Sequence, residues 1–298
     1  MLTALLAAAC GASGSLPAGS SMPTPAPGAI EVVTSTTVFG DMVQRVGGSH
    51  VSVTSLVPRG GDVHTYEPRP AEVESLGRAR LVVMNGLGLD DWLDKLVTTS
   101  SGGSTKVVRL AADLPGAAYL AGQTPGTTNP HLWLDVAYAI GYAERIRDAL
   151  VAVDPAHAAD YTANAAAYVT ELRSLDGWIR DQIGRIPEAD RKLISFHDAF
   201  PYFARAYGVD IVGTVVHSPG QDPSASQVAA LVDAIRKAGV RVVFTEAQFS
   251  PRLVQVIADE TGAKVVGNLY DDTLGDPPVD SYAGVMRWDV TQLVDALR

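Results

Sequence analysis

The feature that most constrains the fold of this 298-residue chain is a regular alternation of strand-like and helix-like stretches from Ile30 onward. Short runs rich in valine and isoleucine predict buried strands, and the amphipathic runs between them predict covering helices. Such alternation is typical of parallel sheets flanked by helices. The expected strands are Glu31–Ser35, Val51–Val57, Leu81–Asn85 and Lys106–Leu110 in the first half, and Lys192–Phe196, Asp210–Val216, Arg241–Thr245 and Lys264–Leu269 in the second. The expected helices beside them are Val38–Val46, Pro70–Ala79, Ala199–Tyr207, Ser226–Ala238 and Pro251–Thr261.

A long helical tract separates the two halves. Asp135–Val151 has apolar residues at helical spacing, and after Pro155 the stretch Ala156–Ile183 continues for roughly seven turns. A connection of this length is unusual inside one compact domain. We therefore predict an α/β fold of two four-stranded parallel-sheet lobes, residues 30–154 and 187–298, joined by a rigid linking helix over residues 155–186. The alternative is one more covering helix with a kink at Gly177.

The amino terminus has the layout of a bacterial lipoprotein signal. Met1–Ala9 is a short apolar run directly before Cys10, the only cysteine, although it lacks a basic residue and Leu6 lies one place too far from Cys10. Residues 11–29 are mainly Gly, Ser, Ala and Pro without charge, which predicts a flexible tether. We expect residues 1–10 to be the signal and the protein to be extracytoplasmic, anchored to the membrane through lipidated Cys10. A frayed apolar terminus with a chance cysteine is the alternative.

Charge and cysteine content exclude several classes of function. The formal net charge is −10 and the sequence pI is near 5.0, whereas a nucleic-acid partner requires clustered Lys and Arg. A single cysteine allows neither an internal disulfide nor a thiolate metal cluster. We therefore expect no nucleic-acid partner, and any metal must be bound by nitrogen and oxygen ligands.

Four residues far apart in the sequence are candidate metal ligands: His64, His131, His197 and Asp272. Each lies where a strand-like run, or the loop after it, gives way to a helix-like stretch. Ligands of open parallel sheets bind beyond the carboxyl ends of the strands, so all four can face one cleft, two from each half. Three imidazoles and one carboxylate suit Zn²⁺, and Mn²⁺ is possible if Asp272 binds through both oxygens.

Each candidate taken alone is more often an ordinary loop or core residue, and only the joint pattern favours a site. Glu246 ends a strand and is expected to orient one of the imidazoles, with a plain loop carboxylate as the alternative. The remaining histidines are weaker candidates. His50 lies at the amino end of a strand, away from the expected cleft, and His157 begins the long helix. His217 could approach the crevice but is better explained as a loop residue.

With these residues assembled, the chain from Val32 to Arg298 resembles the cluster A-I family of zinc and manganese solute-binding proteins of bacterial ABC importers. The resemblance rests on the segments STTVFGDMVQRVGG, PRGGDVHTYEPRPAEVESLGRARLVVMNGLGLDDWL, NPHLWLDVAYA, SFHDAFPYFARAYG, DPSASQVAALVDAIRKAGVRVVFTEAQF and LYDDTLGD. It implies two α/β lobes joined by a long rigid helix, with a metal between them. The family's ligand positions match His64, His131, His197 and, by the spacing in YDDTLGD, Asp272 rather than Asp271.

The function implied by the resemblance is capture of Zn²⁺ and its delivery to a membrane permease, by a monomer that is not an enzyme. Manganese-specific relatives typically have Glu at the third ligand position, so His197 favours zinc. Many zinc members also carry a loop rich in histidine and acidic residues, but Gly116–Asn129 contains neither, which predicts no auxiliary site. The alternatives are a Mn²⁺ receptor, a zinc-dependent hydrolase with Glu246 as its base, and a surface adhesin, which nothing in the sequence specifically supports.

Overall fold

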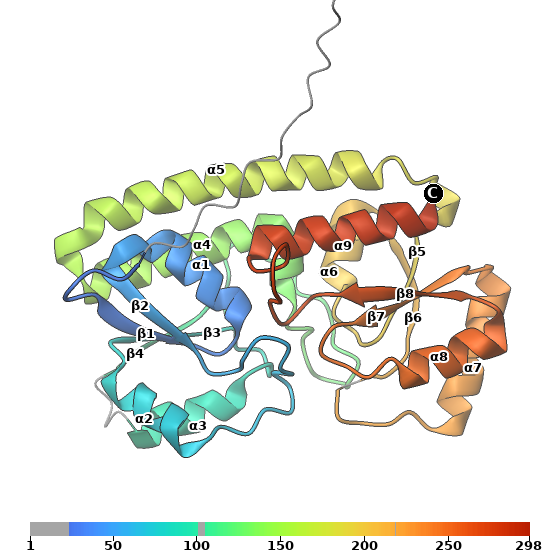
Figure 1. Ribbon diagram of the computed structural model, residues 1–298, viewed down its shortest axis with the longest axis horizontal. Coiled ribbons are helices and arrows are strands. Elements are labelled where there is room, and N and C mark those ends of the chain that lie inside the picture. Colours follow the sequence, from blue (N-terminus) through green and yellow to red (C-terminus); the bar gives the residue numbers. More distant parts are fainter. Residues whose placement is uncertain (1–23, 101–104, 218) are drawn as a thin grey trace, which may run out of the picture.

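The computed structural model describes residues 24–100, 105–217 and 219–298, and it has the predicted α/β fold (Figure 1). The predicted lipidation of Cys10 lies outside the described residues. The first half contains β1 (Ile30–Thr34), α1 (Thr37–Gly47), β2 (Val51–Ser55), α2 (Pro70–Arg78), β3 (Leu81–Met84), α3 (Asp91–Ser100), β4 (Lys106–Arg109) and α4 (Val136–Val153). After α5 (Ala158–Ile183) come β5 (Lys192–Ser195), α6 (Pro201–Tyr207), β6 (Asp210–Thr214), α7 (Ala225–Ala238), β7 (Val242–Glu246), α8 (Arg252–Thr261), β8 (Lys264–Leu269) and α9 (Tyr282–Leu297).

The first half is the expected four-stranded parallel sheet, in the order β2-β1-β3-β4. Helices α1 and α4 cover one face and α2 and α3 cover the other (Figure 1). Because successive side chains of a strand point to opposite faces, Val32 joins the apolar cluster under α1 and α4 while Val33 joins the cluster against α2 and α3. The carboxyl ends of the strands therefore share one edge, from which the loops toward the second half emerge.

The second half contains all four expected strands but differs from the expected single sheet. Hydrogen bonds pair the strands two by two, β5 with β6 and β7 with β8, both parallel. Strands β5 and β7 lie against each other, yet the register of β5 shifts after Leu193 and that of β7 after Phe244. At the end of β5 the backbone N–H groups of Phe196 and His197 donate to the side chain of Glu246. The buried carboxylate of Glu246, the last residue of β7, thus holds the backbone that follows β5.

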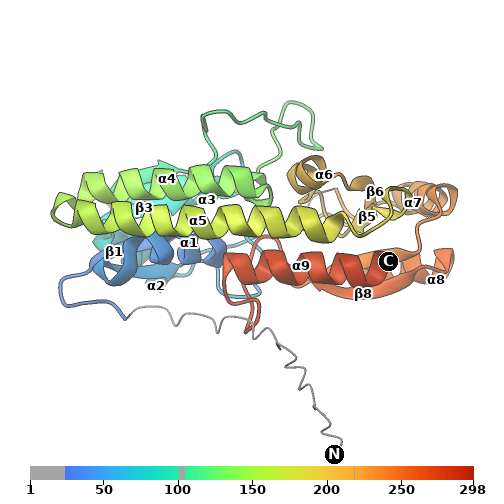
Figure 2. The ribbon, with the colours of Figure 1, turned by 90° about the horizontal axis from the view of Figure 1, so that it is seen from above.

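Helix α5 runs along both halves (Figure 2). It packs on α1 and α4 in the first half and on α6 and α9 in the second. It is uninterrupted through Gly177, so the alternative of a kink there is wrong. Its buried face includes Tyr161, Leu172 and Ile179, which belong to an apolar cluster that continues from the first half into the second. The division into lobes at residues 30–154 and 187–298 stays a prediction.

The local signals explain where several helices begin and end. Ser224 caps α7 through a capping box with Gln227, and Gly239 and Gly262 end α7 and α8 in the left-handed conformation. Helices α3 and α9 were not among those predicted. Within the described ranges, no helix combines the length and apolar character needed to cross a bilayer.

Candidate metal centre

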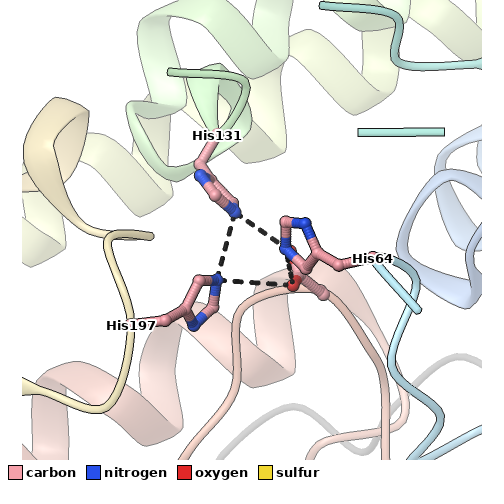
Figure 3. A group of neighbouring side chains, drawn as sticks. His64, His131 and His197 are labelled. Atoms are coloured by element: carbon pink, nitrogen blue, oxygen red, sulfur yellow. Dashed lines mark hydrogen bonds and ion pairs between the residues drawn. The ribbon is translucent and has the colours of Figure 1, made fainter. Parts of the chain in front are cut away.

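The four predicted ligands come from four separate loops that meet between the halves. His64 lies in the loop after β2, and His131 directly precedes a short 3₁₀ turn (Leu132–Leu134) that leads into α4. His197 is the second residue after β5, and Asp272 is the third after β8. The rings of the three histidines point toward one another (Figure 3). Each residue is thus placed by the carboxyl end of a strand or by the loop that starts a helix.

The donor atoms have the spacing that a small cation requires. Each residue offers one ligand atom, and these four atoms lie within 4.8 Å of one another. Asp272 Oδ2 is 3.1 Å from His64 Nε2 and 3.7 Å from His197 Nε2, while Asp272 Oδ1 is 3.5 Å from His131 Nε2. The Nε2 atoms of His131 and His197 are 3.3 Å apart. Four donors around zinc at about 2.0–2.1 Å lie about 3.3 Å from each other, so the spacing fits.

Most of the centre is shielded from water. His131, His197 and Asp272 are buried, with at most 3% of their surface exposed, whereas the side chain of His64 is 16% exposed. A cleft of about 180 Å³ borders the three histidines, and Gln123, Asp198 and His217 also line it. Among the four residues, His64 is therefore the most accessible to solvent.

Glu246 contacts the ring and the backbone of His197. Its Oε2 lies 2.5 Å from His197 Nδ1, and its Oε1 accepts the backbone N–H groups of Phe196 at 2.9 Å and His197 at 3.2 Å. An ionised carboxylate only accepts hydrogen bonds, so Nδ1 of His197 carries a proton and Nε2 faces the other donors. A carboxylate that accepts from the far ring nitrogen of a metal-binding histidine is common around protein-bound zinc.

Sequence reasoning missed Asn129, which holds His131. Its Oδ1 lies 3.1 Å from both the backbone N and the ring Nδ1 of His131. Its Nδ2 donates to the backbone oxygen of Asp198 at 2.7 Å and to its Oδ2 at 3.1 Å. The sequence offered one signal for this residue: Asn129 lies two positions before the candidate ligand His131, in the segment NPH.

The electrostatics of the buried acids separate Asp272 from its neighbour. Burial would raise the pKa of Asp272, but His64, His131 and His197 hold it below its usual range. Burial, together with Glu246 and Asp272, raises the pKa of Asp271 well above its usual range. Asp271 instead supports the loop, because its backbone oxygen accepts Trp133 Nε1 at 3.0 Å and its Oδ1 accepts the backbone N–H of Asp272 at 2.7 Å. The carboxylate that stays ionised is the one directed at the imidazoles.

Two histidines of the centre have opposite pKa shifts. Burial lowers the pKa of His131 well below its ordinary value, although Asp272 acts in the other direction. Burial would also lower the pKa of His197, but Glu246, through its charge and its hydrogen bond to Nδ1, outweighs burial and raises that pKa to about 10. His131 is therefore ready to bind a cation as a neutral ring, whereas His197 must first release a proton.

The remaining histidines lie outside the group of four. His50 and His157 stack on each other with ring centroids 3.9 Å apart, and each contacts an aspartate of its own. His217 does approach the crevice, where its Nδ1 contacts Gln123 Oε1, but it is not among the four clustered donors.

Comparison with known proteins places this geometry in a family. The family described as zinc-uptake complex component A, periplasmic (ZnuA) matches residues 32–296. The chain is 33% identical over 301 residues to the manganese-binding lipoprotein MntA of Halalkalibacterium halodurans, covering 100% of this chain and 96% of that protein. It is 33% identical over 271 residues to the iron-binding protein YfeA of Yersinia pestis, covering 87% and 84% of the two chains.

Solved structures agree with this assignment. The periplasmic zinc-binding protein TroA from Treponema pallidum superposes with a TM-score of 0.84 at 26% identity, covering 91% of this chain and 99% of that one. The Mn-bound periplasmic metal-binding protein from Candidatus Liberibacter asiaticus gives 0.81 at 28% identity, covering 90% and 100%. The chain therefore belongs to the ZnuA family (cluster A-I) of metal-binding, substrate-binding proteins of ABC transporters.

Proposed function

We propose that this protein captures Zn²⁺ with His64, His131, His197 and Asp272 and delivers it to the membrane permease of an ABC importer. The observation that carries the proposal is the convergence of one donor atom from each residue within 4.8 Å. The donors come from loops of both halves, so a single ion can bridge them. Membership of a family of transport receptors supplies the context of delivery.

The donor set favours zinc, and one contact favours manganese as the second candidate. Three imidazole nitrogens and one carboxylate form the nitrogen-rich, four-donor set that zinc prefers. Asp272, however, turns Oδ1 toward His131 and Oδ2 toward His64 and His197. If both oxygens bind the ion, coordination expands beyond four, which suits Mn²⁺.

A hydrolytic function has little support in the contacts of Glu246, the only acid that the sequence offered as a base. Its two oxygens are engaged by the backbone of Phe196 and His197 and by the ring of His197, on the side away from the other imidazoles. A base for metal-bound water must reach the water itself. We therefore propose binding without catalysis, by a monomer attached through Cys10.

The test is a competition titration of metal-stripped protein with Zn²⁺ and Mn²⁺ against a chelator of known affinity. We expect one tight Zn²⁺ site and weaker Mn²⁺ binding. A structural zinc site is worth about 10–16 kcal/mol over four ligands, so His131→Ala costs about 3 kcal/mol, roughly two orders of magnitude in Kd.

The matched control is His157→Ala, because this histidine also contacts an aspartate but lies outside the group. Its Zn²⁺ affinity should equal that of the parent. Equal affinity of His131→Ala and the parent would refute the assigned site. Tighter Mn²⁺ than Zn²⁺ binding at the same site would establish the second candidate.

A further inference from the structure

We propose that Asn129 is a positioning residue for His131, and that its amide makes the orientation of this ligand depend on contact between the two halves. The inference rests on the proposed function, because it concerns one of the four proposed ligands. It adds a residue that touches no metal and acts through another side chain.

The orientation of the Asn129 amide follows from its partners. Nδ2 lies 2.7 Å from the backbone oxygen of Asp198, and a carbonyl oxygen can only accept a hydrogen bond. The nitrogen of the amide must therefore point at Asp198, which leaves Oδ1 on the side of His131. There Oδ1 lies 3.1 Å from the ring Nδ1. An amide oxygen has no proton to give, so Nδ1 of His131 must be the donor.

This hydrogen bond selects one tautomer of His131. A neutral imidazole protonated on Nδ1 has its lone pair on Nε2. Nε2 is the atom that lies 3.5 Å from Asp272 Oδ1 and 3.3 Å from His197 Nε2. In the other tautomer a proton would occupy the position where the cation binds. Asn129 thus keeps the ring ready for metal before any metal arrives.

Asn129 is fastened to the second half at two points, one through its side-chain amide and one through its backbone. Besides the bonds of Nδ2 to Asp198, the backbone oxygen of Asn129 accepts the hydroxyl of Tyr202, in α6, at 3.0 Å. Asp198 directly follows His197 in the sequence. Asn129 therefore connects His131, a ligand of the first half, to the residue next to His197, a ligand of the second half. Asn129 itself is buried, with 1% of its surface exposed, so water does not compete for these bonds. Separation of the halves would release the amide and, with it, the ring of His131.

The test combines nitrogen-15 NMR of histidine-labelled, metal-free protein with the Zn²⁺ competition titration. In the parent, His131 should be protonated on Nδ1 alone. Asn129→Ala should give a mixture of both tautomers and weaken Zn²⁺ binding by about 10- to 100-fold, the usual effect of removing such a partner.

Tyr138→Phe is the matched control. The Tyr138 hydroxyl accepts the N–H of Ala118, in the loop that carries Asn129, and Nη2 of Arg205 in α6, both at 2.9 Å. This variant loses a contact between the same two parts of the chain without touching a ligand, and its affinity should stay within about twofold of the parent. An equal loss in Tyr138→Phe would show that general cohesion, not ligand orientation, is responsible, and would overturn the proposal.

The NMR measurement also separates this inference from the proposed function. A proton on Nε2 of His131 in the parent refutes the positioning role whether or not any variant folds. Unchanged tautomer and affinity in folded Asn129→Ala refute it as well. If the parent bound no Zn²⁺, the proposed function would fail, while the tautomer of the metal-free ring would still decide the role of Asn129.

Discussion

Two places in this molecule bring histidine rings beside carboxylates, and only one has the geometry of a metal site. In the candidate centre the ring of His197 lies at 68° to that of His131 and at 80° to that of His64, and their edges meet at Asp272. In the second place, which we call the surface histidine pair, His50 and His157 stack almost parallel at 20°. Stacked rings direct their lone pairs side by side, so they do not converge on one point.

The two places differ equally in their surroundings. The side chains of His131 and His197 are 3% and 2% exposed, whereas that of His157 is 41% exposed. In the centre Glu246 contacts Nδ1 of His197, so Nε2 of that ring faces the other ligand atoms. In the surface pair the Nε2 atom of His50 itself contacts Asp160. Histidines near acids therefore do not define a site. A site is defined by lone pairs that converge on one point, by burial, and by a hydrogen-bond partner on the ring nitrogen that faces away from that point.

The largest effect should come from removing the carboxylate in each place. Asp272 faces all three imidazoles, and it is the only anion among the donors. Asp272→Ala should weaken Zn²⁺ binding by about a thousandfold, the upper end of the share of one ligand. Asp160→Ala removes the exposed partner of His50 and should leave the Kd within about twofold, because exposed ion pairs contribute little. Chelator competition measures both, and comparable losses would erase the distinction between the two places.

A smaller effect on Zn²⁺ affinity should come from changing the acid that contacts Nδ1 of a histidine in each place. Glu246 accepts hydrogen bonds with both oxygens, one from the backbone and one from His197 Nδ1. Glu246→Gln leaves only one acceptor oxygen, so one of these contacts is lost and His197 loses its orientation. We expect about 10- to 100-fold weaker Zn²⁺ binding by titration. Asp154→Asn changes the equivalent contact of His157 and should not alter the affinity. A Glu246→Gln protein that binds like the parent would remove this acid from the proposed site.

The smallest effect is a dependence on pH of about tenfold in Kd per unit. The pKa of His197 is raised to about 10, because neighbouring carboxylates outweigh burial. Zinc must therefore displace a proton at any pH below that value, and affinity should rise steadily from pH 7 to 9 instead of levelling above the ordinary histidine range near 6.5. The proton stabilises the metal-free fold fully below about pH 6.5, and this stabilisation is lost as the pH rises toward 10.

Calorimetry in buffers of different ionisation enthalpy should count at least one proton released per Zn²⁺ at pH 7.5. An affinity that is constant from pH 7 to 9 would contradict the raised pKa of His197. His157→Ala gives the comparison, because the surface pair should not change the slope.

The sequence predicted the convergence of the four residues because strand order alone carries the ends of parallel strands to one edge. His197 and Asp272 lie two and three residues beyond their strands, so their placement required little more than the strand boundaries. The choice of Asp272 over Asp271 came from the family resemblance. The structure adds a physical reason, since Asp272 faces the Nε2 atoms of all three imidazoles and its pKa is lowered, whereas the pKa of Asp271 is raised.

What the sequence could not predict depends on contacts between distant segments. The pairing of β5 with β6 and of β7 with β8, and the contact of Glu246 with the backbone beyond β5, both join segments that are far apart in the sequence. Asn129 is an ordinary loop residue until the chain brings Asp198 beside it, 69 positions away in the sequence. Helix α9 is different, because its buried Val285, Met286, Val290 and Leu293 follow helical spacing that was available in the sequence.

The shared apolar interior has a consequence for how cargo is exchanged. At 26 residues, α5 is about 39 Å long, and the packed cluster beneath it runs without a break from Val32 to Leu293. Pulling the lobes apart like jaws would bare this interior at about 25 cal/mol for every Å² of apolar surface. This cost disfavours a wide separation of the two halves, so smaller movements of the loops around the centre are the less costly way to exchange an ion.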